Sequence, residues 1–188
     1  MPTAKRLTDA ESWGTYHVSN GAGKYMKLEN TEAVQTASTV WNDTTPTSSV
    51  FSLGTSGLCN GSGKAMVAYC FAEIKGFSKF GSYTGNGNSD GTFVYTGFKP
   101  KWIMIKRTDS SDWWGLWDNK RLGYNPDNYH MRINETNYTE ASKVVEQLSN
   151  GFKIRETDTA INASGGTYIY MAFGQSLVGS NNVPCTAR

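Results

Sequence analysis

The chain has 188 residues, with 18 Lys and Arg against 16 Asp and Glu and a formal net charge of +2. This near-neutral balance, without a basic block, argues against nucleic acid as the main partner, and no apolar run approaches the ~20 residues that span a bilayer. The length suits one domain or two small ones. Twenty glycines, ten tyrosines and six tryptophans, with 18% charged residues, favour a β-rich chain with many turns.

Residues 1–12 are predicted to form an N-terminal arm. They carry Lys5 and Arg6, and no apolar stretch follows, so we expect no secretory signal. The three cysteines have no metal-ligand spacing, and an odd number cannot complete a disulfide framework. They are Cys59, Cys70 and Cys185. Cys70 lies in an apolar run, which predicts a small buried side chain. We therefore expect reduced thiols and folding in a cytoplasm.

The chain repeats part of itself at an offset of about 102 residues. Asn60–Glu73 aligns with Asn162–Gln175, with Asn, Ser, Gly and Phe identical in place. Four further matches lie upstream in the same order: Val50–Leu53 with Gly151–Ile154, Thr31–Ala33 with Thr139–Ala141, Met26–Leu28 with Met131–Ile133, and Trp13–Gly14 with Trp114–Gly115. The offset drifts as loop insertions would make it drift. Five matches in order indicate a duplicated motif.

The two copies differ in completeness. We predict an incomplete repeat over residues 13–76, a complete unit over 77–176 and a C-terminal tail over 177–188. A half-domain cannot bury its apolar face alone. It therefore either packs onto the complete unit in one fused body or completes its sheets with strands of a neighbouring chain. Both alternatives favour an oligomer.

The complete unit is expected to be built from short strands separated by turn-rich loops. The predicted strands are 77–84, 92–96, 102–106, 113–117, 129–133, 152–155 and 167–173. Residues 140–148 are expected to form a short helix, with Thr139 as its N-cap. This pattern predicts an all-β β-sandwich, jelly-roll or lectin-like, with a duplicated motif and at most one short helix.

An ordered series of motifs runs through this unit. The motifs are Tyr83–Gly87, Gly97–Lys106, Trp113–Arg121, Asn150–Phe152 and Asn162–Gly165. The series resembles a β-sandwich module that recurs, often in tandem, in tail-fibre-like and other virion structural proteins of tailed bacteriophages, many of them marine. The resemblance implies a virion location and a lectin-like sandwich, and it supplies no catalytic residues. The chain is short and has no repeat long enough for a fibre shaft, which favours a compact surface or accessory virion protein.

Catalysis gains little support from the sequence. His17 and His130 lie in no metal-ligand spacing, and we expect each to be a surface or hydrogen-bonded residue. Asp112 and Asp118 flank tryptophans, as the paired carboxylates of a glycosidase do, but both lie in polar loops. We therefore expect no enzyme activity and no cofactor. A glycan depolymerase that uses Asp112 and Asp118 is the enzymatic alternative.

A calcium site is considered at the loop over residues 85–91. Oxygen-bearing side chains alternate there at Asn86, Asn88 and Asp90. The loop has a single carboxylate, however, and turns of this composition usually bond their own backbone. We therefore expect no metal.

The aromatic residues favour a binding role. Strand alternation sends one of Trp113 and Trp114 inward and the other outward. An outward ring stacks on a sugar or covers an oligomer contact, and we favour the contact. The candidate ligand or interface residues are Trp113, Trp114, Trp117, Asp118, Arg121 and Tyr124.

Together these observations predict a non-enzymatic bacteriophage virion protein, assembled in the cytoplasm of the host bacterium. We expect a homo-oligomer, a trimer, that holds neighbouring capsid or tail subunits as a head decoration or a tail accessory protein. A tail-fibre module that binds host surface glycan is the alternative. Neither nucleic acid nor a membrane is expected as a partner.

Overall fold

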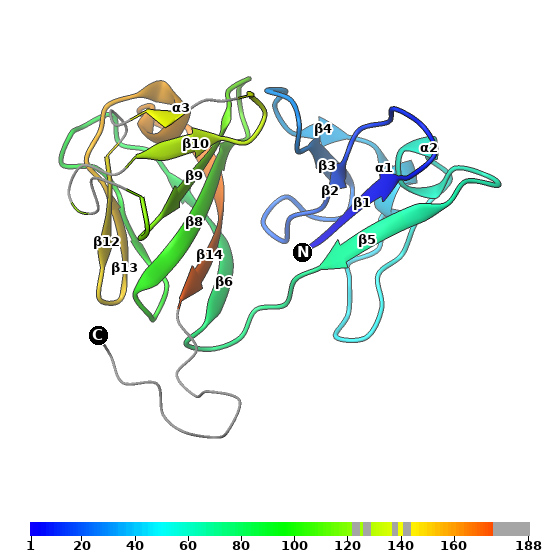
Figure 1. The fold of residues 1–188 in the computed structure, drawn as a ribbon, viewed down its shortest axis with the longest axis horizontal. Helices are drawn as coiled ribbons and strands as arrows, with labels where there is room; N and C mark the ends of the chain where they lie inside the picture. The colour runs from blue at the N-terminus through cyan, green and yellow to red at the C-terminus, as the bar shows by residue number, and fades with distance from the viewer. Residues whose placement is uncertain (122–124, 126–128, 137–138, 141–143, 175–188) are drawn as a thin grey trace.

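The structure, a computed structural model, describes residues 1–121, 125, 129–136, 139–140 and 144–174. These residues form two β-rich units that lie side by side, and an extended segment after residue 70 connects them (Figure 1). The fold is all-β and sandwich-like, as the sequence predicts, and its strands pair antiparallel. Within the described part of the chain, no helix is long and apolar enough to cross a membrane.

The first unit contains one five-stranded sheet, ordered β4-β3-β2-β1-β5, and two single-turn helices. Its elements are β1 (Pro2–Arg6), β2 (Gly14–Thr15), β3 (Lys24–Lys27), β4 (Gln35–Thr36), α1 (Ser38–Trp41), α2 (Gly57–Asn60) and β5 (Met66–Cys70). β1 pairs with both β2 and β5 and is therefore an interior strand of the sheet. The predicted N-terminal arm over residues 1–12 is wrong in this respect. β1 has no recognisable strand pattern in the sequence, because two of its five residues are charged and its apolar residues do not alternate.

The second unit is a sandwich of a six-stranded and a three-stranded sheet. Its elements are β6 (Ser78–Thr84), β7 (Phe93–Tyr95), β8 (Pro100–Arg107), β9 (Trp114–Asp118), β10 (His130–Arg132), β11 (Thr139–Glu140), β12 (Val145–Leu148), β13 (Gly151–Ile154), α3 (Thr159–Asn162) and β14 (Thr167–Gly174). The sheets are ordered β11-β10-β9-β8-β14-β6 and β12-β13-β7. Side chains from both sheets, among them Ile103, Phe152 and Tyr170, form one buried cluster between them.

The two units share one topology. The first sheet, β4-β3-β2-β1-β5, corresponds strand by strand to β11-β10-β9-β8-β14 of the second. The registers also correspond, because Arg6 lies opposite Met66 in the first sheet and Arg107 lies opposite Tyr168 in the second. The first copy therefore begins at β1. It has no segment that corresponds to β6 and β7, and the segment that corresponds to β12 and β13 forms no strand. This arrangement extends the duplication that the sequence indicates.

The central strand β14 is buried on both faces. Tyr168, Tyr170 and Ala172 point into the sandwich, whereas Ile169 and Met171 belong to a second buried cluster on the opposite face. That cluster contains Met26, Phe80, Met104, Trp114, Ile169 and Met171, with Met1, Leu28 and Val34 of the first unit packed against it or nearby. The first unit therefore covers the outer face of the six-stranded sheet.

A polar contact joins the same two surfaces. His17 is buried, and its Nε2 lies 3.1 Å from the main-chain oxygen of Tyr170 on β14. The backbone N–H of Ser19 donates to Nδ1, so Nε2 carries the proton and donates to Tyr170. Burial lowers the pKa of His17 to about 4, which keeps the ring neutral. His17 is thus a hydrogen-bonded residue, which is one of the two roles that the sequence predicts for it.

The first unit also has a small core of its own. Tyr16, Val40, Trp41 and Cys59 are buried there, and the segment around Phe51 packs against them. With this core on one face of its sheet and the six-stranded sheet on the other, the incomplete repeat forms one fused body with the complete unit. The sequence leaves two alternatives open, packing onto the complete unit or completion of the sheets by a neighbouring chain. For the two faces of the sheet, the described residues show packing onto the complete unit.

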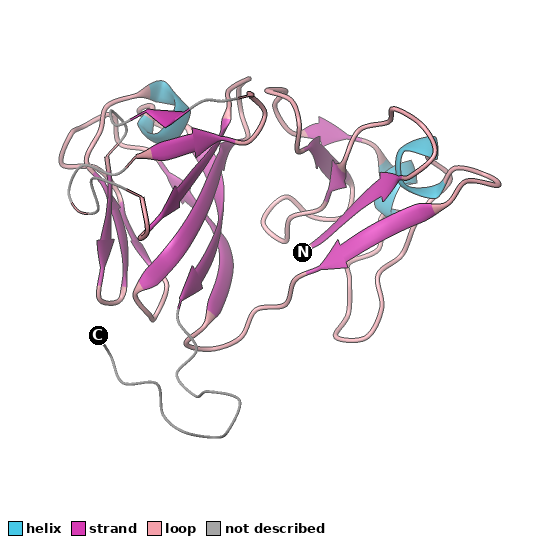
Figure 2. Cartoon of the chain, in the orientation of Figure 1, coloured by secondary structure: helices cyan, strands magenta, loops and turns pink. Residues whose placement is uncertain are grey.

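In the part of the chain that the structure describes, the helices are three single turns, α1, α2 and α3 (Figure 2). The helix predicted over residues 140–148 is wrong, because Val145–Leu148 is β12 and pairs with β13. Its side chains alternate in burial, with Val145 and Gln147 inside. Pairing across the tight turn at residues 149–150 outweighs the helical spacing of the apolar residues.

The prediction that Cys70 is buried is wrong. Cys70 is exposed because β5 lies at a sheet edge.

Candidate functional site

The tryptophans selected from the sequence are all buried. Trp113, Trp114 and Trp117 have exposed fractions of 7%, 1% and 0%. Trp113 and Trp117 face the sandwich core, and Trp114 faces the opposite way, as strand alternation predicts. The sequence predicts that the outward ring stacks on a sugar or covers an oligomer contact, but the first unit of the same chain covers Trp114, and the main-chain oxygen of Lys27 accepts its indole N–H at 3.0 Å. None of the three rings is available to stack on a sugar.

Asp118 and Arg121, which belong to the same prediction, lie at the far end of β9. The Asp118 carboxylate forms a 2.6 Å ion pair with Arg121 and accepts backbone N–H bonds from Lys120 and Arg121. Partial burial alone would raise the pKa of Asp118, but these bonds outweigh it and hold the pKa below its ordinary value. The pair therefore closes a turn. Tyr124 lies outside the described residues.

The geometry opposes a glycosidase pair at Asp112 and Asp118. The two residues flank opposite ends of β9, and the four residue steps from Trp114 to Asp118 alone span ~13 Å at the rise of a strand. Retaining and inverting enzymes hold their carboxyl groups about 5 Å or about 6.5–9.5 Å apart. No group of three or more His, Cys, Asp or Glu suited to a metal occurs among the described residues.

The candidate calcium loop bonds its own backbone, as expected. The Asn86 and Asn88 side chains accept backbone N–H bonds from Asn88 and Asp90. Asp90 forms ion pairs with Lys153 and Arg155. The oxygens that would bind a cation are therefore engaged in turns and ion pairs.

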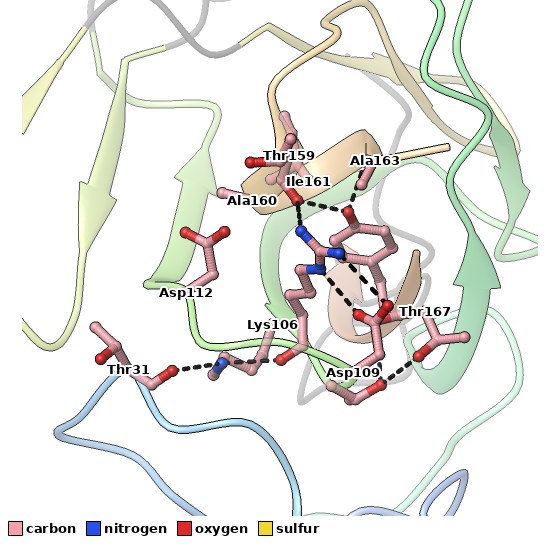
Figure 3. Close-up of polar contacts among 12 residues, drawn as sticks. Thr31, Lys106, Asp109, Asp112, Thr159, Ala160, Ile161, Ala163 and Thr167 are labelled. Carbon is pink, nitrogen blue, oxygen red and sulfur yellow. Dashed lines mark hydrogen bonds and ion pairs between the residues drawn. The ribbon is translucent and has the colours of Figure 1, made fainter. Parts of the chain in front are cut away.

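A buried lysine lies at the end of β8, where the two units meet (Figure 3). Lys106 has no exposed surface, and its Nζ donates to the main-chain oxygens of Thr31 and Arg107 at 3.2 and 2.8 Å. The same Thr31 oxygen accepts the backbone N–H of Asp112 at 2.8 Å. Burial lowers the pKa of Lys106 to about 8 and raises the pKa of Asp112. These contacts attach the loop before β4 to the second unit.

The arginine that follows this lysine, Arg107, has a counterpart in the first unit, Arg6, and the two make equivalent structural contacts. Arg107 pairs with Asp109 and donates to the main-chain oxygen of Thr159, the first residue of α3. Arg6 pairs with Asp9 and donates to the main-chain oxygen of Gly57, the first residue of α2. Lys-Arg followed by Asp recurs at residues 5–9 and 106–109, and this sequence signal lies outside the five matches that define the repeat.

We expect the pH dependence of stability to reveal the buried lysine. Above pH 8 the native state loses the Lys106 proton, whereas the unfolded chain keeps it up to about pH 10.5. Because the unfolded state then binds more protons, the free energy of unfolding of the wild type should rise relative to Lys106→Met, by up to about 3 kcal/mol across this window. Urea unfolding at a series of pH values measures the difference. Lys5→Met, at the half-exposed counterpart, is the control, and parallel curves for wild type and Lys106→Met would contradict the prediction.

The clearest difference between the two copies is the outer edge of β5. Its counterpart β14 pairs with β8 on one side and, over seven residue pairs, with β6 on the other. β5 pairs only with β1 among the described strands. The main-chain groups of Ala65 and Phe71 form hydrogen bonds with Leu7 and Met1, which flank β1. Because the direction of the backbone N–H and C=O groups alternates along a strand, those of Met66, Ala68 and Cys70 point away from the sheet.

The side chains around this edge are exposed and apolar. Tyr69 and Phe71 are 53% and 36% exposed, and Ile74 and Val50 are exposed nearby. Natural edge strands are usually protected by a lysine, a proline or a bulge, and residues 65–72 contain neither lysine nor proline. The edge therefore combines unpaired backbone groups with apolar surface.

A cavity of about 360 Å³ adjoins the end of β5. It lies between residues 46–51 and residues 70–73, which correspond in the second unit to the β12–β13 turn and the end of β14. In the second unit, β7 pairs with β13 and β6 pairs with β14. The cavity and the open edge thus occupy the place where the first unit lacks counterparts of β6 and β7.

The comparisons with known proteins bear on this duplicated body as a whole. Residues 1–176 match a family model described as a domain of unknown function, DUF7483. The chain belongs to this family. The DUF7483 match spans both units and the segment between them. No curated protein and no solved structure shows significant similarity to the chain.

Proposed function

We propose that the protein is a structural component of a tailed-bacteriophage virion, a homo-oligomer at the particle surface that holds neighbouring virion subunits as a head decoration or tail accessory protein. The observation that carries the proposal is the open apolar edge of β5, at the point where the duplicate unit has another strand. Such an edge is a ready template for pairing with another chain.

Two further features support an assembly role. The motif series from Tyr83 to Gly165 resembles virion sandwich modules. The two carboxylate residues considered for catalysis lie at structural contacts, since Asp118 closes a turn and the backbone N–H of Asp112 donates to Thr31 where the two units meet. A body with an unprotected apolar edge is suited to pairing with a neighbour in a fixed register.

Quantitative mass spectrometry of purified particles tests the proposal. We expect the protein in every particle, at hundreds of copies if it decorates the head and at a handful if it belongs to the tail. Its absence from washed infectious particles, with the protein present in the infected cell, would exclude the virion role. Light scattering of the purified protein supplies the oligomeric state independently.

Glycan binding is the second candidate, and a polar cleft favours it. The cleft, of about 510 Å³, lies between the two units, and Lys24 and Asp109 contribute opposite charges to it. Its hydroxyl lining comes from Ser19, Ser82, Thr84, Thr108 and Thr167. Hydroxyl and charged groups of this kind hydrogen-bond sugars, but the two tyrosines that line the cleft, Tyr83 and Tyr168, are buried and offer little ring surface for stacking. A glycan array with the purified protein distinguishes this function from assembly.

A further inference from the structure

We propose that β5 pairs antiparallel with β5 of a second copy across a two-fold axis at Ala68, which joins the two five-stranded sheets into one continuous sheet. This inference rests on the proposed function for its premise that copies of the chain meet, and it names the partner and the register. The contact is isologous, with the same surface contributed by each copy. It therefore replaces the trimer expected from the sequence with a two-fold pair.

The backbone restricts the possible registers. Antiparallel strands join residues whose N–H and C=O groups point toward each other, and in β5 these outward residues are Met66, Ala68 and Cys70. A strand that pairs with its own copy must therefore place a single residue on the two-fold axis. With Ala68 on the axis, Met66 lies opposite Cys70 of the second copy, and Ala68 lies opposite Ala68 of the second copy.

The side chains favour this register over its neighbours. On the face of the sheet directed toward the six-stranded sheet, Val67 lies opposite Tyr69 of the second copy, and Ala65 lies opposite Phe71 of the second copy. Each pair combines a smaller with a larger side chain, and β-branched–aromatic pairs stabilise antiparallel sheets. The length of β5 adds to this, because an axis at Ala68 pairs all five residues Met66–Cys70, whereas an axis at Tyr69 would leave Met66 opposite Ala72, beyond the end of the strand.

A second copy fits this edge better than a segment of the same chain. β6, the strand that occupies the equivalent edge in the second unit, is already committed to β14 over seven residue pairs. Each copy carries one open edge of the same length, and a two-fold contact satisfies both edges at once. The exposed Tyr69 and Phe71 would then be partly covered without rearrangement of either unit.

Disulfide trapping tests the partner and the register. In a Cys70→Ser, Cys185→Ser background, Ala68→Cys places two thiols on the axis, where the Cα atoms of a hydrogen-bonded pair lie about 5.5 Å apart, within disulfide range. We expect a cross-linked dimer under mild oxidation, formed at least about tenfold faster than with Tyr69→Cys in the same background. Tyr95→Cys, at an exposed position of β7 in the second unit, is the control and should remain monomeric on a denaturing gel. Cross-linking that is equally fast at positions 68, 69 and 95 would contradict the proposal.

A second variant separates pairing from thiol chemistry. Ala68→Lys places a charge on an exposed position at the centre of the edge, and light scattering should show a shift from dimer to monomer with an unchanged circular dichroism spectrum. A wild type that is monomeric at the highest attainable concentration and gives no Ala68→Cys cross-link would overturn the inference, even if particles contain the protein. A trapped dimer that is absent from particles would leave the pairing in place and overturn the virion role. The two failures are therefore distinguishable.

Discussion

Replacing Trp114 with alanine is expected to lower the free energy of unfolding by about 4 kcal/mol. The indole is 1% exposed, lies in the cluster between the units with Met26, Met104 and Met171, and donates to the main-chain oxygen of Lys27. Its removal leaves a large cavity in the contact that joins the two units. Urea unfolding, followed by circular dichroism, measures the loss, and the first unit should unfold at a lower urea concentration than the second.

The duplication provides a matched control. Trp13 corresponds to Trp114 in the repeat, but it is only half-buried and stacks on Tyr69 with ring centroids 6.0 Å apart. We expect Trp13→Ala to cost about 1 kcal/mol, because less apolar surface leaves water in the folded state at this position. Trp114→Phe keeps most of the buried ring and loses the hydrogen bond, so it should fall between the two alanine variants. Equal effects of Trp114→Ala and Trp13→Ala would show that the cluster between the units does not hold the body together.

Much of the fold was predictable because the strong strands carry their own signal. The strands predicted over residues 77–84, 102–106 and 167–173 are β6, β8 and β14 with small changes in their ends. Each is apolar or alternating and is bounded by glycine-rich turns. The repeat was also visible, because residues that fix turns, such as Asn60 and Asn162, recur with their neighbours.

The errors arose where distant contacts decide the structure. β1 is short and partly charged, and it becomes an interior strand only because β2 and β5 pair with both of its edges. The pattern over residues 145–148 is compatible with a helix or a strand until β13 is in place. Trp114 faces outward from its own sandwich, and only a residue 87 positions earlier, Lys27, shows that the first unit covers it. Local periodicity contains no information on such contacts.

The open edge of β5 could likewise be predicted only in part from the sequence. The sequence shows that the repeat over residues 13–76 is incomplete, and the structure limits the segment without a counterpart to the one that contains β6 and β7. The sequence did not show which edge is left open, because that depends on β5 lying outside β1 in the sheet order. The number of aromatic residues favours a binding role, but Trp113 and Trp117 are buried in the sandwich core, and Trp114 is buried in the cluster between the two units.

Asn162→Ala is the second substitution for which we expect a large effect, a loss of about 3 kcal/mol in the free energy of unfolding. The Asn162 side chain is fully buried and makes four hydrogen bonds. Its Oδ1 accepts the backbone N–H of Asn86, and its Nδ2 lies within bonding distance of Asn86 Oδ1 and of the main-chain oxygens of Asn88 and Glu156. Alanine would leave these groups without partners in a site closed to water, where each unsatisfied group is costly.

The counterpart in the first unit makes the test specific to the missing strands. Asn60 keeps one of these bonds, from Nδ2 to the main-chain oxygen of Gly54, which corresponds to Glu156. The other three partners lie in the loop between β6 and β7, which the first unit lacks. Asn60→Ala should therefore cost about 1 kcal/mol, and Asn162→Asp, which keeps the acceptor and loses the donors, should fall between the two. Calorimetric melting of the three variants under identical conditions gives the order. If Asn60→Ala were as damaging as Asn162→Ala, the first unit would have to hold Asn60 through a strand supplied by another chain, and the loss would then depend on protein concentration.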